Sequence, residues 1–158
     1  GKLGKLENLL SHTEIPVVHS DRGGDVTYHG PGQLVVYLLL DLARRNLGVR
    51  QLVSLIEDTL ICLLSSYGIS ASTIEQVPGV FVGRKKIGFL GLRIRSGKTY
   101  HGFSLNIDMD LTPFRIINPC GYEGLEVTDL KELGKNTEMK NVVNDIKAIL
   151  DLKLSKLV

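Results

Sequence analysis

The sequence has no long apolar run, little net charge and only two cysteines, and each shortage excludes a class of protein. Its longest apolar stretch, Leu34 to Leu40, is far shorter than the roughly 20 residues of a membrane-spanning helix. The 19 basic and 17 acidic side chains give a formal charge of +2, which argues against a nucleic-acid-binding face. Two cysteines are too few for a disulfide scaffold and indicate a reducing compartment. We therefore expect no membrane span, no nucleic-acid partner and no disulfide framework.

What remains is a chain able to fold as one ordinary domain. At 158 residues and 43% hydrophobic, it can bury about two thirds of its unfolded surface, and no repeat or linker divides residues 1–158. The 17 glycines concentrate between Gly23 and Gly32 and between Gly79 and Gly102, where the backbone needs unusual freedom. The chain opens with Gly1 instead of methionine, so the lack of a targeting signal carries no weight.

The hydrophobic pattern predicts both helices and strands. Apolar residues recur at helical spacing from Val49 to Tyr67, with Gly68 as the terminating residue, and again from Met139 to Leu150, with Thr137 as the expected N-cap and Glu138 in the first turn. The predicted strands are Pro16–His19, Gln33–Asp41 (buried on both faces), Val80–Val82, Ile87–Arg95 and Thr99–Ile107. The last three read as an antiparallel meander with turns at Gly83–Lys86 and Ser96–Gly97. The fold class expected is α+β, with helices packed on a mixed, largely antiparallel sheet.

Cys120 is the first candidate for chemistry. It stands between Pro119, which fixes the preceding backbone, and Gly121, which lets an amide approach a ligand closely. The spacing alone fits a small buried apolar residue or a nucleophile whose thiolate is stabilised by a nearby cation. Cys62 lies off the apolar face of its helix, and we assign it no role.

The cations Arg84, Lys85 and Lys86 form the second candidate cluster. Such a run in a hairpin turn is typical of a solvated charged tip. Lys86 differs because it stands at the start of a predicted strand, where its side chain can lie along the sheet. Both interpretations of Lys86 stay open at this point.

Two histidines, His29 and His101, each precede a glycine. A loop histidine is more often a structural hydrogen-bonding group than a catalyst, and His101 could equally be a core residue. The glycine-rich segment 22–30 resembles an anion-binding nest, but it lacks the ending of a Walker loop and the Gly-x-Gly-x-x-Gly pattern. Two cysteines and four histidines without paired spacing predict no metal site.

The run from Arg22 to Gln33, Arg-Gly-Gly-Asp-Val-Thr-Tyr-His-Gly-Pro-Gly-Gln, resembles the signature of the octanoyltransferases, also called lipoate-protein ligase B. The resemblance continues in order from Ile15 to about Leu130. It is carried by Pro78-Gly79-Val80, Lys86-Ile87, Leu90-Gly91-Leu92-Arg93, His101-Gly102-Phe103, Leu105-Asn106-Ile107 and Ile117-Asn118-Pro119-Cys120-Gly121. It implies the catalytic-domain fold shared with biotin protein ligases and lipoate ligases.

The resemblance implies an acyl transfer without a cofactor. Members of the family move octanoyl from the phosphopantetheine of acyl carrier protein to a lysine of lipoyl domains, in 2-oxoacid dehydrogenases and the glycine-cleavage H protein. It implies a cytoplasmic enzyme in bacteria, or a mitochondrial matrix enzyme in eukaryotes. The family also has strands and a helix ahead of the position where this chain begins, so we expect a single catalytic domain over residues 1–158 that lacks those elements.

The resemblance also assigns the site residues. The family's catalytic cysteine matches Cys120 and its catalytic lysine matches Lys86, which would stabilise the thiolate and move protons. The amides of Cys120 and Gly121 are the candidate oxyanion donors. The implied substrate-binding residues are Arg22, Gly23, Gly24, Asp25, Val26, Thr27, Tyr28, His29, Phe89, Leu90, Gly91, Gly102, Phe103 and Ser104.

Two departures from the family pattern bear on the pocket. Phe89 stands where the family has a small residue and Ser104 where it has alanine, so the acyl length is left open. Other functions also remain open: an ATP-dependent lipoate ligase, a cysteine-dependent relay of octanoyl between lipoyl domains, a non-catalytic lipoyl-domain binder, or a hydrolase. The hydrolase would use Cys120 with His101 or His29 and Asn106.

Overall fold

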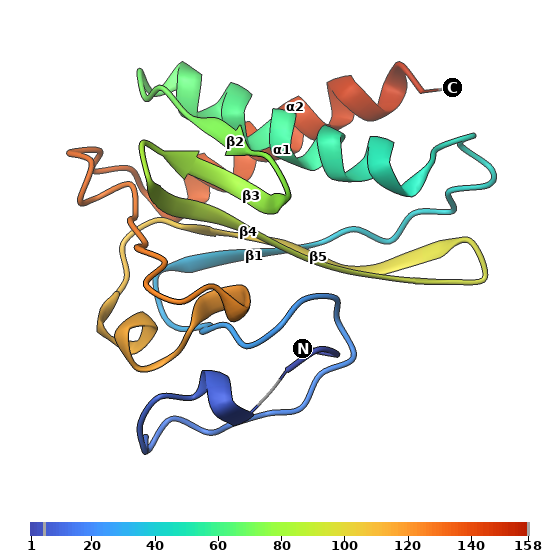
Figure 1. The fold of residues 1–158 in the computed structure, drawn as a ribbon. Coiled ribbons are helices and arrows are strands. Elements are labelled where there is room, and N and C mark those ends of the chain that lie inside the picture. The colour runs from blue at the N-terminus through green and yellow to red at the C-terminus, as the bar shows by residue number, and fades with distance from the viewer. Residues whose placement is uncertain (5, 158) are drawn as a thin grey trace.

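The computed structural model describes residues 1–4 and 6–157 and has three layers. Two long helices cover one face of a five-stranded sheet, and irregular segments cover the other face (Figure 1). The strand order is β1-β5-β4-β3-β2, and every neighbouring pair is antiparallel. The strands are β1 Gln33–Tyr37, β2 Ser72–Ile74, β3 Val77–Val82, β4 Lys85–Arg95 and β5 Lys98–Asn106; the helices are α1 Val49–Ser66 and α2 Met139–Ser155, with short 3-10 helices at Leu6–Asn8, Thr112–Ile116 and Pro119–Gly121. The expected α+β class is confirmed.

Helix α1 supplies much of the main core. Of the side chains that its spacing places on one face, five are completely buried and Val53 and Tyr67 are half-buried; the five are Leu52, Ile56, Leu60, Leu63 and Leu64. Each such burial contributes roughly 1.5–3 kcal/mol, which explains why this amphipathic stretch stays helical against the sheet. Gly68 follows the helix with a φ of 72°, the left-handed conformation expected of it.

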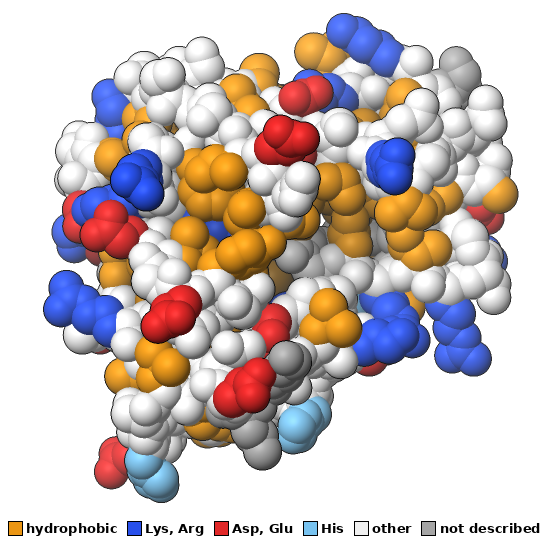
Figure 2. All heavy atoms as spheres, viewed as in Figure 1, with side chains coloured by type: hydrophobic (Ala, Val, Ile, Leu, Met, Phe, Trp, Pro, Cys, Tyr) orange, Lys and Arg blue, Asp and Glu red, His pale blue; other side chains and the backbone are white. Residues whose placement is uncertain are grey.

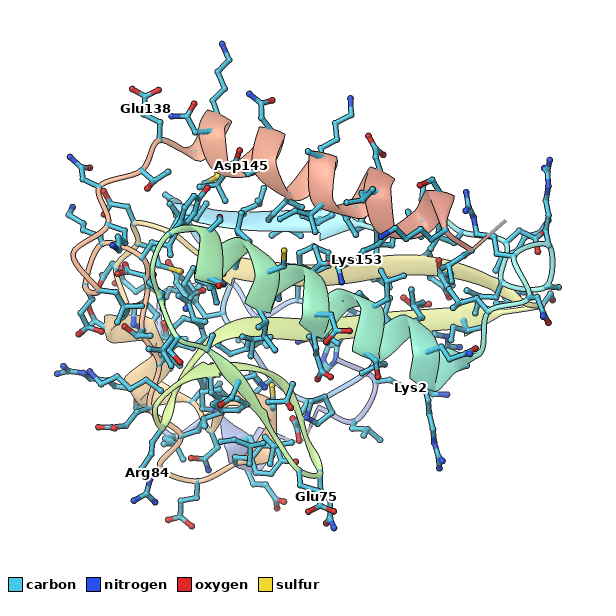
Figure 3. The ribbon with its side chains drawn as sticks, turned by 90° about the horizontal axis from the view of Figure 1, so that it is seen from above. Lys2, Glu75, Arg84, Glu138, Asp145 and Lys153 are labelled. Carbon is cyan, nitrogen blue, oxygen red and sulfur yellow. The ribbon has the colours of Figure 1, made fainter. Side chains whose placement is uncertain are left out.

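Helix α2 packs beside α1 through Val142, Ile146 and Leu150. Its expected N-cap is wrong by one position, because the cap is Glu138 and not Thr137. The Glu138 carbonyl already accepts the first helical hydrogen bonds, from the amides of Asn141 and Val142, so Glu138 lies outside the first turn. Figure 3 shows the Glu138 side chain extending away from the helix.

The antiparallel meander of β3, β4 and β5 is confirmed, with one change at its first turn. Only Gly83 and Arg84 connect β3 to β4, since Lys85 and Lys86 already pair with Val82 and Phe81. Arg84 points outward from this turn in Figure 3, as expected of a solvated charge. The hydrophobic pattern does not predict strand β2, because β2 is short and its side chains are exposed on both faces.

Two strand predictions near the N-terminus are wrong. Residues 16–19 form an irregular segment with no sheet partner, and Val17 and Val18 are 57% and 77% exposed. Strand β1 ends at Tyr37, and it is buried on one face only, since Val35 and Tyr37 are exposed. Strand β1 lies at the edge of the sheet, with β5 as its single strand partner. One face of β1 packs on the helix side, and its other face is open toward the layer of irregular segments, which is why apolar residues occur on both faces.

The sheet face opposite the helices carries a second, smaller core. Phe89 of β4 packs there with Phe114 and Ile117 from the segment after β5. Residues 20–29 cross the same face, so two segments far apart in sequence lie together over the sheet (Figure 1). Basic and acidic side chains are interspersed on the face seen in Figure 2, and hydrophobic side chains gather near its centre. None of the helices within residues 1–4 and 6–157 is long and apolar enough to cross a membrane.

Candidate active site

Lys86 lies inside the molecule, although it is only two residues from an exposed turn. Its side chain is 1% exposed, which resolves the two interpretations of this lysine against a solvated charge. The ammonium group donates to the carbonyl oxygen of Pro78 at 2.7 Å and lies 5.1 Å from the ring centre of Phe89. Burial lowers the pKa of Lys86 below its usual range, and the neighbouring Cys120 partly opposes that shift.

The sequence around Gly79 makes room for the lysine. Gly79 has a φ of 132°, a conformation that other residues rarely adopt, and a Cβ there would overlap the Lys86 side chain. Its amide donates to Glu57 of α1 at 3.0 Å, which fixes the strand at this point. The glycine in Pro-Gly-Val thus leaves the space that the end of the Lys86 side chain occupies.

Cys120 meets Lys86 from the opposite layer. The Lys86 Nζ lies 3.6 Å from the Cys120 Sγ, and this contact joins β4 to the 3-10 helix at Pro119–Gly121. Cys120 has a φ of 59°, uncommon for a residue other than glycine, and its amide donates to the Val26 carbonyl at 2.9 Å. Strained backbone of this kind persists where the surroundings hold a residue in position, as they do for this half-buried thiol.

The expected oxyanion donors are not available in this arrangement. The Cys120 amide is taken by Val26, and the Gly121 amide donates to the Asn118 carbonyl at 2.9 Å. The tight turn that strains Cys120 uses both N–H groups internally, so the geometry contradicts the assignment of either amide as a donor to substrate.

A pocket with about 430 Å³ of empty space, part of it open to solvent, begins at Cys120. It lies between the exposed sheet face and the segment 20–29. The predicted residues that line it are Arg22, Thr27, His29, Phe89, Leu90, Gly91, Gly102, Phe103 and Ser104, joined by Val35, Tyr37 and His101. The structure thus brings most of the predicted substrate-binding residues to one pocket beside the Cys120–Lys86 pair.

Register across three strands explains the shape of the pocket floor. Phe89, Ser104 and Val35 stand opposite one another on β4, β5 and β1, and Gly91 and Gly102 form the next row. Two adjacent glycines remove side chains from the sheet surface, so the floor there is backbone. The result is a shallow apolar channel bounded at one end by the Phe89 row.

Arg22 holds the glycine-rich loop against this floor. Its guanidinium donates to the carbonyls of Gly23 at 2.9 Å and Asp25 at 2.7 Å, and its aliphatic stem lies over Gly91. The Gly23 amide donates to the Leu92 carbonyl at 2.8 Å, a close approach that leaves no space for a Cβ. The loop is therefore held by Gly23, Gly24 and Asp25, which do not themselves line the pocket.

Val26 and Tyr28 are directed elsewhere. Both pack into the small core with Phe114, where the Tyr28 ring lies edge-on at 5.6 Å. Asp25 is buried, accepts from the Asn8 amide group at 2.7 Å and accepts from the Val26 amide. These predicted substrate-binding residues do not line the pocket at Cys120, although Val26 and Tyr28 line a second pocket that shares Arg22 and Thr27 with it.

Sequence reasoning missed a cluster at the pocket rim. The Asp21 carboxylate accepts from the Tyr100 hydroxyl at 2.6 Å and lies 2.8 Å from His101 Nε2, and these contacts lower the pKa of Asp21 to about 2. His101 has a φ of 61° inside β5, which turns its side chain out of the core and toward this rim. In the sequence, the only indication of this cluster is that His101 precedes a glycine.

The histidines have partners other than the cysteine. His29 Nδ1 lies 2.7 Å from Gln33 Oε1, as expected of a structural hydrogen-bonding group, and burial lowers the pKa of His29. The Asn106 side chain bonds to Gln33 at 2.8 Å and to the Thr128 carbonyl at 3.0 Å. Within residues 1–4 and 6–157 the polar side chain that contacts the Cys120 sulfur is Lys86. The arrangement therefore favours a cysteine–lysine pair over a cysteine–histidine hydrolase.

The fold is similar to that of known protein ligases. A biotin protein ligase from Aquifex aeolicus in complex with biotin and ATP matches with a TM-score of 0.65, at 20% identity over 79% of this chain and 51% of that one. A lipoate-protein ligase A bound with ATP matches with a TM-score of 0.67, at 16% identity over 85% of this chain and 57% of that one. At these identities the likeness confirms the expected fold.

Sequence comparison is more specific. An octanoyltransferase of Pseudomonas putida is 60% identical over 142 residues, which cover 90% of this chain and 66% of the relative. An octanoyltransferase of Laribacter hongkongensis is 53% identical over 156 residues, covering 99% of this chain and 75% of the relative. The chain thus spans about two thirds to three quarters of the length of these curated relatives. The model of the lipoyl protein ligase A/B catalytic domain matches residues 4–151, and the chain belongs to that family.

Proposed function

We propose that the chain is the catalytic part of an octanoyltransferase that carries an acyl group on Cys120. The observation that carries this proposal is the 3.6 Å contact between a buried lysine amine and a cysteine sulfur at the end of an apolar pocket. Curated relatives at 53–61% identity bear the name octanoyltransferase, which fits an acyl chain in that pocket.

The first half-reaction forms the acyl-enzyme. The Cys120 thiolate attacks the carbonyl carbon of the octanoyl thioester of acyl carrier protein, and the C–S bond to the phosphopantetheine breaks. The ammonium of Lys86 donates a proton to the departing thiolate. A buried amine suits this task, because burial lowers the pKa of Lys86 and makes it a better acid.

The second half-reaction uses the same pair in reverse. The ε-amine of a lysine on a lipoyl domain attacks the Cys120 thioester, and the sulfur leaves as a thiolate. The neutral Lys86 amine accepts the proton that the attacking nitrogen loses. Both half-reactions are thioester chemistry and need no nucleotide, so we propose a transferase without a cofactor.

The partners follow from this chemistry. The donor is an acyl carrier protein, and the acceptors are lipoyl domains of 2-oxoacid dehydrogenases or the glycine-cleavage H protein. We place the reaction in the bacterial cytoplasm, because the curated relatives are bacterial proteins. Arg22, Gly91 and Gly102 would lie along the acyl chain, with Phe89 at the end of the pocket beside Lys86 and Cys120.

A transfer assay tests the proposal against its rivals. Octanoyl carrier protein and an apo lipoyl domain are incubated with the chain in buffer without ATP, and the lipoyl domain is analysed by intact mass. The proposal expects octanoylated domain. Free octanoate without domain modification would indicate the hydrolase, and modification by octanoate only with ATP would indicate the ligase.

A matched acceptor controls this assay. A lipoyl domain whose target lysine is replaced by arginine should accumulate no octanoyl group, and the acyl-enzyme should persist instead. Modification of the arginine variant, or binding of the unaltered lipoyl domain with no transfer to its lysine, would contradict the proposed reaction.

A further inference from the structure

Thr27 differs from its neighbours in where its side chain points. All three residues line a second pocket under the segment, where Val26 and Tyr28 pack on the small core, but of the three Thr27 alone also lines the pocket that contains Cys120. Within residues 1–4 and 6–157, the Thr27 hydroxyl oxygen is the one fully buried side-chain N or O atom without a hydrogen-bond partner. An unpaired buried hydroxyl lowers the stability of the fold, so a bound substrate that accepts its hydrogen bond would explain its presence.

The backbone ties Thr27 to the cysteine. The Cys120 amide donates to the carbonyl of Val26 at 2.9 Å, and Thr27 directly follows Val26 in the chain. The thiol and the hydroxyl therefore approach the pocket from two segments joined by a hydrogen bond. A carbonyl group attacked by the sulfur would lie beside this hydroxyl.

The two backbone amides of the turn that carries the sulfur are already engaged. The amides of Cys120 and Gly121 donate to the Val26 and Asn118 carbonyls. The Arg22 guanidinium donates to two carbonyls of its own loop, and the Lys86 ammonium donates to the Pro78 carbonyl as well as contacting the sulfur. An acyl transfer needs a donor where negative charge develops on oxygen, and the Thr27 hydroxyl differs from these cationic side chains in having no partner in the protein.

We propose that Thr27 is a catalytic residue whose hydroxyl donates a hydrogen bond to the thioester carbonyl oxygen and to the oxyanion formed from it. This inference rests on the proposed acyl transfer. When the Cys120 thiolate adds to the carbonyl carbon, the C=O pair moves onto the oxygen, which accepts from Thr27. Collapse restores the C=O bond and expels the pantetheine thiolate, which is protonated by Lys86. The amine attack in the second half-reaction forms a second oxyanion at the same position, and its collapse expels the Cys120 thiolate.

The test combines activity with stability. Thr27→Val keeps the shape and removes the hydroxyl, so we expect both half-reactions to slow about 100-fold or more in single-turnover assays at saturating substrate. Its KM should change little, and its Tm should rise, because the unpaired buried hydroxyl is gone. Thr27→Ser restores a donor and should recover most of the rate.

Thr59→Val is the matched control. Thr59 is completely buried in α1, but its hydroxyl donates to the Leu55 carbonyl at 2.7 Å. We expect Thr59→Val to leave the transfer rate unchanged and not to gain stability as Thr27→Val does.

Two outcomes would overturn the assignment. A Thr27→Val variant that transfers octanoyl at the wild-type rate removes the catalytic role, and a slow variant with lowered Tm that serine does not rescue indicates a structural role. A wild-type chain that forms no acyl-enzyme would refute the proposed function itself, so the two proposals fail in distinguishable ways.

Discussion

Gly79→Ala tests whether the position of the Lys86 amine sets the rate. The substitution adds one methyl group outside the pocket and removes no functional group. Its Cβ would overlap Lys86 Cε and lie 2.6 Å from the Gly88 carbonyl oxygen and 3.0 Å from Lys86 Nζ. The lysine side chain can move, so the amine is displaced from Cys120, while the contact with the Gly88 backbone adds to the cost in stability.

The magnitude follows from the backbone and from the amine. At a φ of 132°, alanine at position 79 is strained by about 1–3 kcal/mol, which lowers Tm by roughly 2–4 °C for each kcal/mol in a chain of this size. A displacement of about 1 Å in a reacting group costs on the order of 100-fold in rate. We therefore expect a modestly destabilised variant that transfers octanoyl about 100-fold more slowly.

Gly83→Ala provides the control for strain alone. Gly83 also has a positive φ, 59°, but no atom lies within 4 Å of an added Cβ. We expect a loss of about 1–2 kcal/mol in stability and an unchanged rate. Thermal unfolding and single-turnover octanoyl transfer are measured for both variants. Equal rates in Gly79→Ala and Gly83→Ala would refute the argument that the lysine must be seated where it is.

Two more predictions concern side chains that touch the pair. For Lys86→Met we expect loss of transfer and a different dependence of stability on pH. Burial lowers the pKa of Lys86 in the folded protein below its value of 10.5 in the unfolded chain, so between these two pKa values the unfolded chain binds more protons. The free energy of unfolding of the wild type therefore rises with pH in that range. Urea unfolding from pH 7 to 10 should show that rise in the wild type and not in Lys86→Met, and parallel curves would contradict it. Phe89 stacks on Phe114 at 5.4 Å and is buried beside Lys86, so Phe89→Ala should remove packing from the small core. We expect the free energy of unfolding in urea to fall by about 3–5 kcal/mol, and a loss below about 1 kcal/mol would show that the ring does not pack there.

Much of the fold could be predicted because it rests on periodic burial. The α1 face of Leu52, Ile56 and Leu60 and the meander of β3 to β5 follow from spacing that local sequence carries directly. The errors fall where a partner decides the outcome. Residues 16–19 have strand-like composition but no strand beside them, and β1 has apolar residues on both faces while lying at the sheet edge.

Sequence motifs predict which residues belong to the candidate site, but they do not predict how those residues are arranged. The buried contact of Lys86 with Cys120 depends on a β-strand that begins earlier than the turn pattern indicates. The engagement of the Cys120 and Gly121 amides depends on the left-handed turn at Cys120, which no spacing reveals. The Asp21 contacts with Tyr100 and His101 join residues about 80 positions apart, so only the folded chain brings them together.

The acyl-enzyme on Cys120 is the central claim, and intact-mass spectrometry after brief incubation with octanoyl carrier protein tests it most directly. We predict one octanoyl adduct on the wild-type chain, mapped to Cys120 after digestion, and no adduct on Cys120→Ser. A wild-type chain without an adduct, or an adduct that persists in Cys120→Ser, would contradict the account.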